Sequence, residues 1–191
     1  CRMGLIELRR QDHPLPSRIV DASERFVRHL LGDGRFDGRV DDLLSWRSEQ
    51  LMPGELLPDT VPFPEIPPLG SRHESAIVCM RSHQGSGAVC IAHHRLHMSG
   101  HPRVLILEAH DLPHDTSECR DAVYASLREA ALACTPMIVD ARRITADRVA
   151  EVITWVDQGF IPVIVITGPS MSLDLPPDRI VDVPVAAPAV R

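Results

Sequence analysis

The second half of the chain alternates short apolar runs with stretches of helical periodicity, and this pattern restricts the possible folds most. The runs expected to be strands are 76–80, 104–108, 137–140, 163–167 and 180–185. The stretches expected to be helices are 88–98, 117–133 and 145–158. Short, almost wholly apolar strands connected by amphipathic helices are typical of a parallel sheet covered on both faces. The pattern predicts an α/β domain of three layers.

Two shorter regions precede this domain. Residues 1–50 contain two stretches with helical spacing, 23–31 and 39–50, so we expect a small helical extension that packs onto the larger body. Residues 51–70 hold six prolines, which remove backbone donors and fix φ. That stretch is expected to be an exposed, extended linker. The predicted domains are therefore 1–50, the linker 51–70, and an α/β domain at 71–191.

Composition excludes some classes of function. The formal net charge of −6 opposes a general nucleic-acid surface, which would need a basic stripe. No apolar run approaches the roughly 20 residues that cross a bilayer, and the N-terminal residues lack a signal-peptide pattern. We expect a cytoplasmic protein with no nucleic-acid or membrane partner. The chain begins at Cys1 without a Met, which suggests a piece of a longer protein. Cys79, Cys90 and Cys134 lie in apolar contexts and are expected to be reduced and buried.

A glycine-containing turn, 80–89, lies between the first strand and the first helix of the α/β domain. A phosphate-binding P-loop of the form G-x-x-x-x-G-K-[ST] occupies this place in nucleotide-binding domains. Here Ser82 stands at the first Gly position, Ala88 replaces the Lys, and Val89 replaces the Ser or Thr. All 20 basic residues are Arg, so no other Lys can substitute. The turn is either a vestigial P-loop or a plain strand-to-helix turn without a ligand. The vestigial cofactor-binding residues would be Gly85, Ser86, Gly87, Ala88 and Val89.

The third predicted strand ends in Asp140, as a Walker B strand does. Such an Asp orients the Mg²⁺ shell, and an acid at the next position polarises the attacking water. That next position holds Ala141. Thr167, at the end of the fourth strand, could sense a γ-phosphate, although Thr is ordinary there. We add Asp140 to the vestigial site and expect no catalytic residue, no resident cofactor, and at most weak binding of ATP and Mg²⁺.

In order and spacing, these features resemble the N-terminal, degenerate P-loop domain of bacterial AAA-family ATPases that carry a C-terminal winged-helix domain. The matching patches are 25–33, 36–40, 81–92, 127–140 and 162–168. Members of that group often accompany contractile injection systems. The resemblance implies an inactive module, a pseudoenzyme, whose parent ATPase carries intact Walker motifs in a second module. It also implies protein partners, namely sister modules, neighbouring subunits or a client protein, and is compatible with a homo-oligomer.

Two other interpretations remain open. One is a P-loop ATPase domain that still binds nucleotide weakly through Gly85 and Gly87, with Asp140 on the metal. The other is an unrelated doubly wound domain that binds partner proteins. The order of strands separates the last interpretation from the first two, because an AAA sheet runs 5-1-4-3-2 and a flavodoxin-like sheet runs 2-1-3-4-5.

Histidines offer weaker candidate sites. His93 and His97 have the i,i+4 spacing of zinc ligands, but the apolar side of their helix lies elsewhere. We therefore expect both on a solvated or interface face without a metal. The polar segment 110–115 could hold a metal or an acid–base pair. Asp115 or Thr116 capping the following helix is the simpler explanation.

Overall fold

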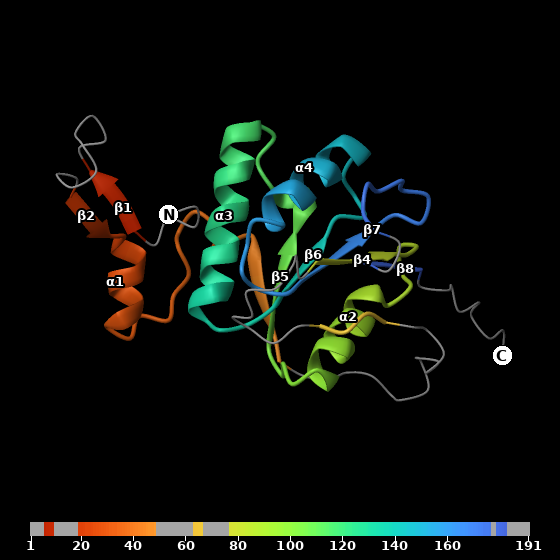
Figure 1. Cartoon of the computed structure of the whole chain (residues 1–191), viewed down its shortest axis with the longest axis horizontal. Helices are drawn as coiled ribbons and strands as arrows, with labels where there is room; N and C mark the ends of the chain where they lie inside the picture. The colour runs from red at the N-terminus through yellow and green to blue at the C-terminus, as the bar shows by residue number, and fades with distance from the viewer. Residues whose placement is uncertain (1–5, 10–18, 49–62, 67–76, 177–178, 183–191) are drawn as a thin grey trace.

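A six-stranded, mostly parallel sheet forms the centre of the structure (Figure 1). The structure is a computed structural model, and it describes residues 6–9, 19–48, 63–66, 77–176 and 179–182. The strands of this sheet are β3 (Leu44–Arg47), β4 (Ile77–Arg81), β5 (Val104–Glu108), β6 (Met137–Asp140), β7 (Val163–Thr167) and β8 (Ile180–Asp182). The helices that cover it are α2 (Ala88–Met98), α3 (Thr116–Leu132) and α4 (Ala146–Val156), and a short 3-10 turn, η2 (Ala109–Asp111), follows β5. The predicted mixed α/β architecture is confirmed at this level.

The strands lie in the order β3-β5-β6-β7-β4-β8. All neighbouring pairs are parallel except β3 and β5, which are antiparallel. Numbering the parallel strands from β4 to β8 along the chain as 1 to 5, the order read from β8 is 5-1-4-3-2. This is the order expected of an AAA sheet, and it differs from the flavodoxin-like order.

Two hydrophobic layers cover the sheet, one on each face. Alternate side chains of a strand point to opposite faces. Leu105 and Val165 accordingly pack in the layer under α3 and α4, while Ile106 and Ile166 pack in the layer under α2. Burial on both faces explains why these strands are almost continuously apolar.

The starts of α3 and α4 agree with the sequence. Asp115 accepts hydrogen bonds from the backbone N–H groups of Ser117 and Glu118, each at 2.9 Å, which confirms it as the cap of α3. Helix α4 begins after Thr145, as predicted, although the Thr145 side chain makes no capping hydrogen bond. Within the described ranges, no helix is long and apolar enough to cross a membrane.

The N-terminal part is not simply helical, so that prediction is wrong. β1 (Ile6–Arg9) and β2 (Ile19–Ala22) form an antiparallel pair, followed by α1 (Glu24–Leu30). The helix expected over 39–50 is absent from 39–48, the described part, and Leu44–Arg47 is the edge strand β3. The free edge of β5 offers backbone hydrogen bonds that outweigh weak local helical spacing.

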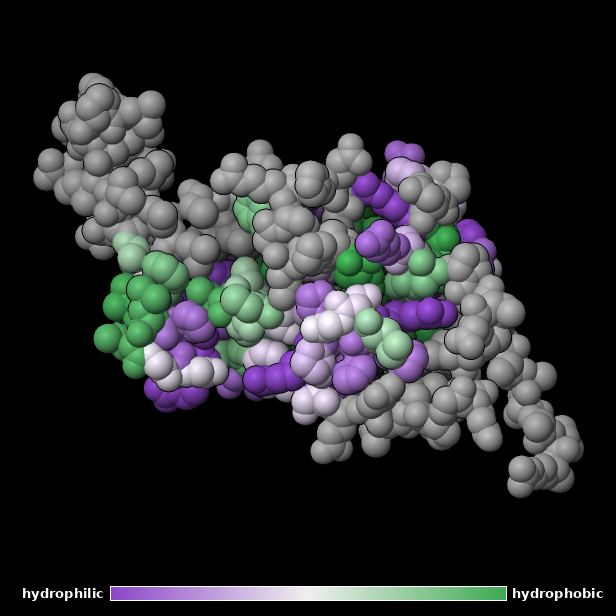
Figure 2. Space-filling model, turned by 60° about the horizontal axis from the view of Figure 1, so that its bottom comes forward, coloured by the Kyte–Doolittle hydropathy of each residue, from purple (hydrophilic) through white to green (hydrophobic). Residues whose placement is uncertain are grey.

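Helix α1 attaches to the body by charge rather than by the predicted apolar face. Leu30 and Leu31 are 68% and 81% exposed. In Figure 2 a hydrophobic patch lies at the end of the molecule where Figure 1 places α1. Arg25 of α1 instead forms a bidentate ion pair with Glu129 of α3, with atom pairs at 2.6 to 3.0 Å.

Most of the predicted linker, 51–70, lies outside the described residues. Of the part that is described, 63–66, Ile66 is buried in the layer under α2, and Phe63 packs against the same layer. The chain is therefore packed at these residues rather than exposed. The division of the chain into three domains stays a prediction.

Candidate functional site

The glycine turn joins the end of β4 to the start of α2, as expected. Gly85 and Gly87 adopt φ values of +78° and +72°, in the left-handed region that glycine tolerates at no steric cost. Gly87 is the N-cap of α2, and no side chain caps this helix. Its first N–H groups are thus free of side-chain caps, as in a phosphate-binding turn.

Three strand ends meet at this turn. The N–H of Ser82, after β4, donates to the carbonyl of Thr167 at the end of β7 at 3.0 Å. The N–H of Ala141, after β6, donates to the carbonyl of Ile166 at 2.8 Å. Ligands bind outside the carboxyl ends of parallel strands where the strand order reverses, and β4 lies at such a reversal. The candidate site therefore lies where an α/β sheet is expected to bind a ligand.

Asp140 is held by an arginine that sequence reasoning missed. The Arg142 guanidinium donates to both carboxylate oxygens of Asp140, with Nε 2.9 Å from Oδ1. The side chains of Arg142 and Asp140 are 15% and 11% exposed. Hydrogen bonding with Asp140 raises the pKa of Arg142. The sequence did hold a clue, because an Asp side chain often accepts a hydrogen bond from the backbone N–H two residues ahead. Arg142 stands at that position after Asp140, and its backbone N–H donates to Asp140 Oδ1 at 3.2 Å.

Arg142 also reaches the glycine turn. Its Nη1 atom donates to the carbonyl of His83 at 3.4 Å, across 59 residues of sequence. One guanidinium thus links the end of β6 to the turn after β4. A metal ion near Asp140 would have to compete with the positive charge of this guanidinium, which already bonds both carboxylate oxygens.

The remaining vestigial positions supply little chemistry. Ala88, at the Lys position, is fully buried in the layer under α2, and Val89 packs against that layer. Within the described residues, the hydroxyl oxygens of Ser82 and Ser86 are buried without a hydrogen-bond partner. The turn therefore offers backbone N–H groups and hydroxyls to a ligand, without a cation of its own.

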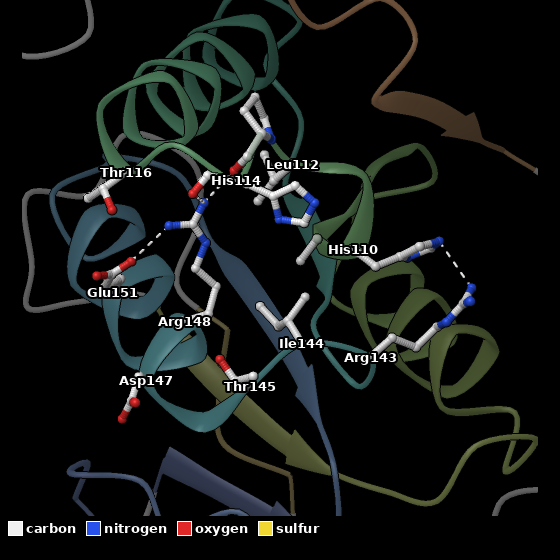
Figure 3. A pocket seen from close by; sticks show the side chains of 12 residues that line it. His110, Leu112, His114, Thr116, Arg143, Ile144, Thr145, Asp147, Arg148 and Glu151 are labelled. Carbon is white, nitrogen blue, oxygen red and sulfur yellow. Dashed lines mark hydrogen bonds and ion pairs between the residues drawn. The ribbon is translucent and has the colours of Figure 1, made fainter.

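A cavity of 450 Å³ lies beside the ends of β5 and β6 (Figure 3). Leu112 and Ile144 point toward its middle, whereas Asp147 points away. Arg148 is engaged at the rim with Glu151, at 3.0 Å, and with the carbonyl of Pro113. The cavity combines an apolar floor with polar groups that already bind one another.

Charged groups at the ends of β5 and β6 influence each other. Glu108 ends β5 opposite Asp140 in the sheet register. Burial and the neighbouring Asp140 carboxylate both raise the pKa of Glu108. Near it, Arg143 Nη1 lies 3.1 Å from His110 Nε2. Nowhere in the described part of the chain do three or more His, Cys, Asp or Glu side chains gather in a way that could hold a metal.

Two expectations about burial are wrong, and a third, for Cys90, holds only in part because that residue is half-buried. His93 is buried, not solvated, because the segment after α2 covers it and the carbonyl of Pro102 bonds its ring. Burial lowers the pKa of His93. Cys134 is exposed, because it follows the last turn of α3 at a positive φ of 48°. Cys119, within α3, is buried instead.

Comparisons with known proteins add little. No protein-family model matches the chain, and no curated protein matches it. Among solved structures, the chain is similar to one described as "Structure of Rhizobiales Trip13", with 17% identity and a TM-score of 0.39. The similar region covers 57% of this chain and 45% of that chain, less than half of its length.

Proposed function

We propose that this chain is a non-catalytic, AAA-like P-loop domain with a structural or regulatory role in a larger bacterial AAA-family ATPase. The strand order 5-1-4-3-2, with a glycine turn after the first of these strands, supports an AAA-like domain. The observation that carries the loss of catalysis is Arg142, which occupies both oxygens of Asp140 and also contacts the turn at His83.

Energetics support the loss of nucleotide chemistry. A hydrogen bond to a charged group contributes about 1.5–3 kcal/mol net. Replacing the Lys with Ala88 removes an interaction of this kind, and replacing the hydroxyl with Val89 removes a ligand of Mg²⁺. Ala141, at the position of the second acid, removes the group that polarises the attacking water in such enzymes.

What remains at the turn is weak anion binding. Backbone N–H groups and the dipole of α2 stabilise one anionic group by about 0.3–2 kcal/mol. Binding at tens of micromolar needs roughly −6 kcal/mol. We expect millimolar phosphate or sulfate binding at 85–88, and no ATP binding detectable at about 100 μM.

The domain would then act through protein contacts in the cytoplasm. Its partners would be sister AAA modules, neighbouring subunits or a client protein, and a homo-oligomer fits this role. Light scattering during size-exclusion chromatography measures the oligomeric state directly.

Calorimetry with ATP and Mg²⁺, together with steady-state phosphate release, tests the proposal. We expect neither micromolar binding nor release above background. The rival interpretation is a weak ATPase, favoured by the retained Gly85, Gly87 and Asp140. Phosphate release that is lost in Asp140→Ala would establish that rival and overturn the proposal. Micromolar ATP binding without phosphate release would show that the turn still binds nucleotide and is not vestigial.

A further inference from the structure

A cleft of 330 Å³ lies between α1, the segment that follows it, and α3. Four arginines line it, Arg25, Arg28, Arg39 and Arg128, together with the carboxylates of Glu24 and Asp37. Because α3 and α2 cover opposite faces of the sheet, this arginine cleft lies on the other side of the sheet from α2.

Positive charge exceeds negative charge in the ion-pair network around the arginine cleft. The ion pairs are Arg25–Glu129, Arg28–Asp33, Arg35–Asp33, Arg39–Asp37 and Arg128–Asp37. Five arginines therefore share three carboxylates, an excess of two positive charges. The exposed Glu24 at the rim reduces the excess to one. This local excess occurs in a chain whose formal charge is −6.

Arg128 is the most deeply placed of these cations with an unused donor. Its side chain is 6% exposed, and its Nη2 atom pairs with Asp37. Its Nε atom is buried and has no hydrogen-bond partner within the described residues. Burial lowers the pKa of Arg128, and so do the nearby Arg39 and Arg25 cations, whereas Asp37 raises it. A buried charged donor is unfavourable without an acceptor.

We propose that the arginine cleft binds a phosphate monoester. Arginine forks match the oxygens of phosphate, and each phosphate oxygen can accept several N–H bonds. A phosphate monoester is anionic at pH 7 and offers three strong acceptor oxygens, against the two of a carboxylate, so it can bond more of these arginine donors. The cleft is large enough for the phosphate and the first atoms of its ester. The ester comes from a small metabolite or from a phosphorylated side chain of a partner protein.

Amide chemical shifts of the full chain locate the binding. The probes are inorganic phosphate, O-phosphoserine, and a phosphoserine peptide beside its unphosphorylated form. We expect the amides of 23–28 and 37–39 to shift, and these can be resolved from the amides of Gly85 and Gly87. Shifts confined to the glycine turn would overturn the proposal and would leave the weak turn site standing.

Variants of rim residues test the chemistry without disturbing the buried network. Arg39→Gln removes a cation that is 64% exposed and leaves Asp37 paired with Arg128, so we expect folding to persist and phosphate affinity to fall about tenfold. Glu24→Gln removes the opposing carboxylate and should tighten binding about two- to fivefold. Arg120→Gln is the control, because Arg120 is an exposed arginine of α3 with contacts to Ser117 and Asp121.

The affinities of the probes and variants show whether the arginine cleft is a site and which kind of phosphate ester it binds. Equal affinity for O-phosphoserine and the phosphopeptide supports a small phosphate metabolite, whereas at least tenfold tighter binding of the phosphopeptide supports a phosphorylated partner. Affinity that is unchanged in Arg39→Gln, or reduced equally in Arg120→Gln, would refute the arginine cleft as a site. Equal binding of the phosphorylated and unphosphorylated peptides would refute it as well.

Discussion

Removing the Arg142 side chain would expose what this residue does at Asp140. In Arg142→Ala the Asp140 carboxylate keeps its buried position but loses a bidentate partner, and the contact with His83 disappears. The neighbouring carboxylate of Glu108 remains in register with Asp140. The variant therefore holds two carboxylates side by side at the strand ends, without a cation between them and the turn.

The size of the effect follows from burial. Removing one partner of a fully buried ion pair costs about 3–5 kcal/mol, while an exposed pair contributes about 0–1 kcal/mol. The side chains of Arg142 and Asp140 are 15% and 11% exposed, nearer to the buried case. We expect a loss of about 2–3 kcal/mol in the free energy of unfolding, and a melting temperature lower by roughly 5–10 °C for a chain of this size.

The loss should depend on pH and on divalent cations. Burial and Asp140 raise the pKa of Glu108, whereas Arg142 lowers it, so removing Arg142 should raise the pKa of Glu108 further. The deficit is therefore full at pH 7 and shrinks as pH falls and Glu108 binds a proton. Mg²⁺ should raise the melting temperature of the variant more than that of the wild type, because in the variant no guanidinium bonds the Asp140 oxygens or repels the cation.

Urea unfolding at pH 7 and pH 5, with and without Mg²⁺, measures both effects. Arg143→Ala is the matched control, since Arg143 is exposed and contacts His110 rather than a carboxylate. A deficit below about 0.5 kcal/mol in Arg142→Ala, or one equal to that of the control, would refute the argument that Arg142 secures Asp140.

Three further predictions concern other parts of the molecule. In a double-mutant cycle with Arg25→Met and Glu129→Met, each single change should lower the free energy of unfolding by about 3–5 kcal/mol, and the double change should lower it by much less than the sum. Urea unfolding measures these values, and additive losses would show that the pair does not hold α1. Hydrogen bonding with Arg39 lowers the pKa of Asp37 to about 2, so its contribution is complete above pH 4 and is lost as pH falls toward 2. The stability difference between wild type and Asp37→Asn should narrow over that range. Burial raises the pKa of Cys79 to about 12, so iodoacetamide at pH 8 should modify the exposed Cys134 and spare Cys79, as peptide mass mapping would show.

The sequence by itself determined the elements of the α/β half, because their signals are local. Runs of β-branched residues predict β6 and β7 within the bounds that the structure has. Asp115 predicts the start of α3, since a cap needs only the backbone N–H groups two and three residues ahead. Gly85 and Gly87 mark the turn because few other residues adopt its positive φ values.

Only the tertiary structure decided what those elements do to one another. Leu44–Arg47 becomes a strand because β5 offers a free edge, although its local spacing resembles a helix. His93 is buried because the segment after α2 folds back over it. Arg142 closes the candidate site because β6 lies close enough to the β4 turn for one side chain to reach His83. The edge strand and the reach of Arg142 depend on contacts between residues far apart in the chain, and the burial of His93 depends on how the chain returns after α2. No local pattern of residue types encodes such contacts.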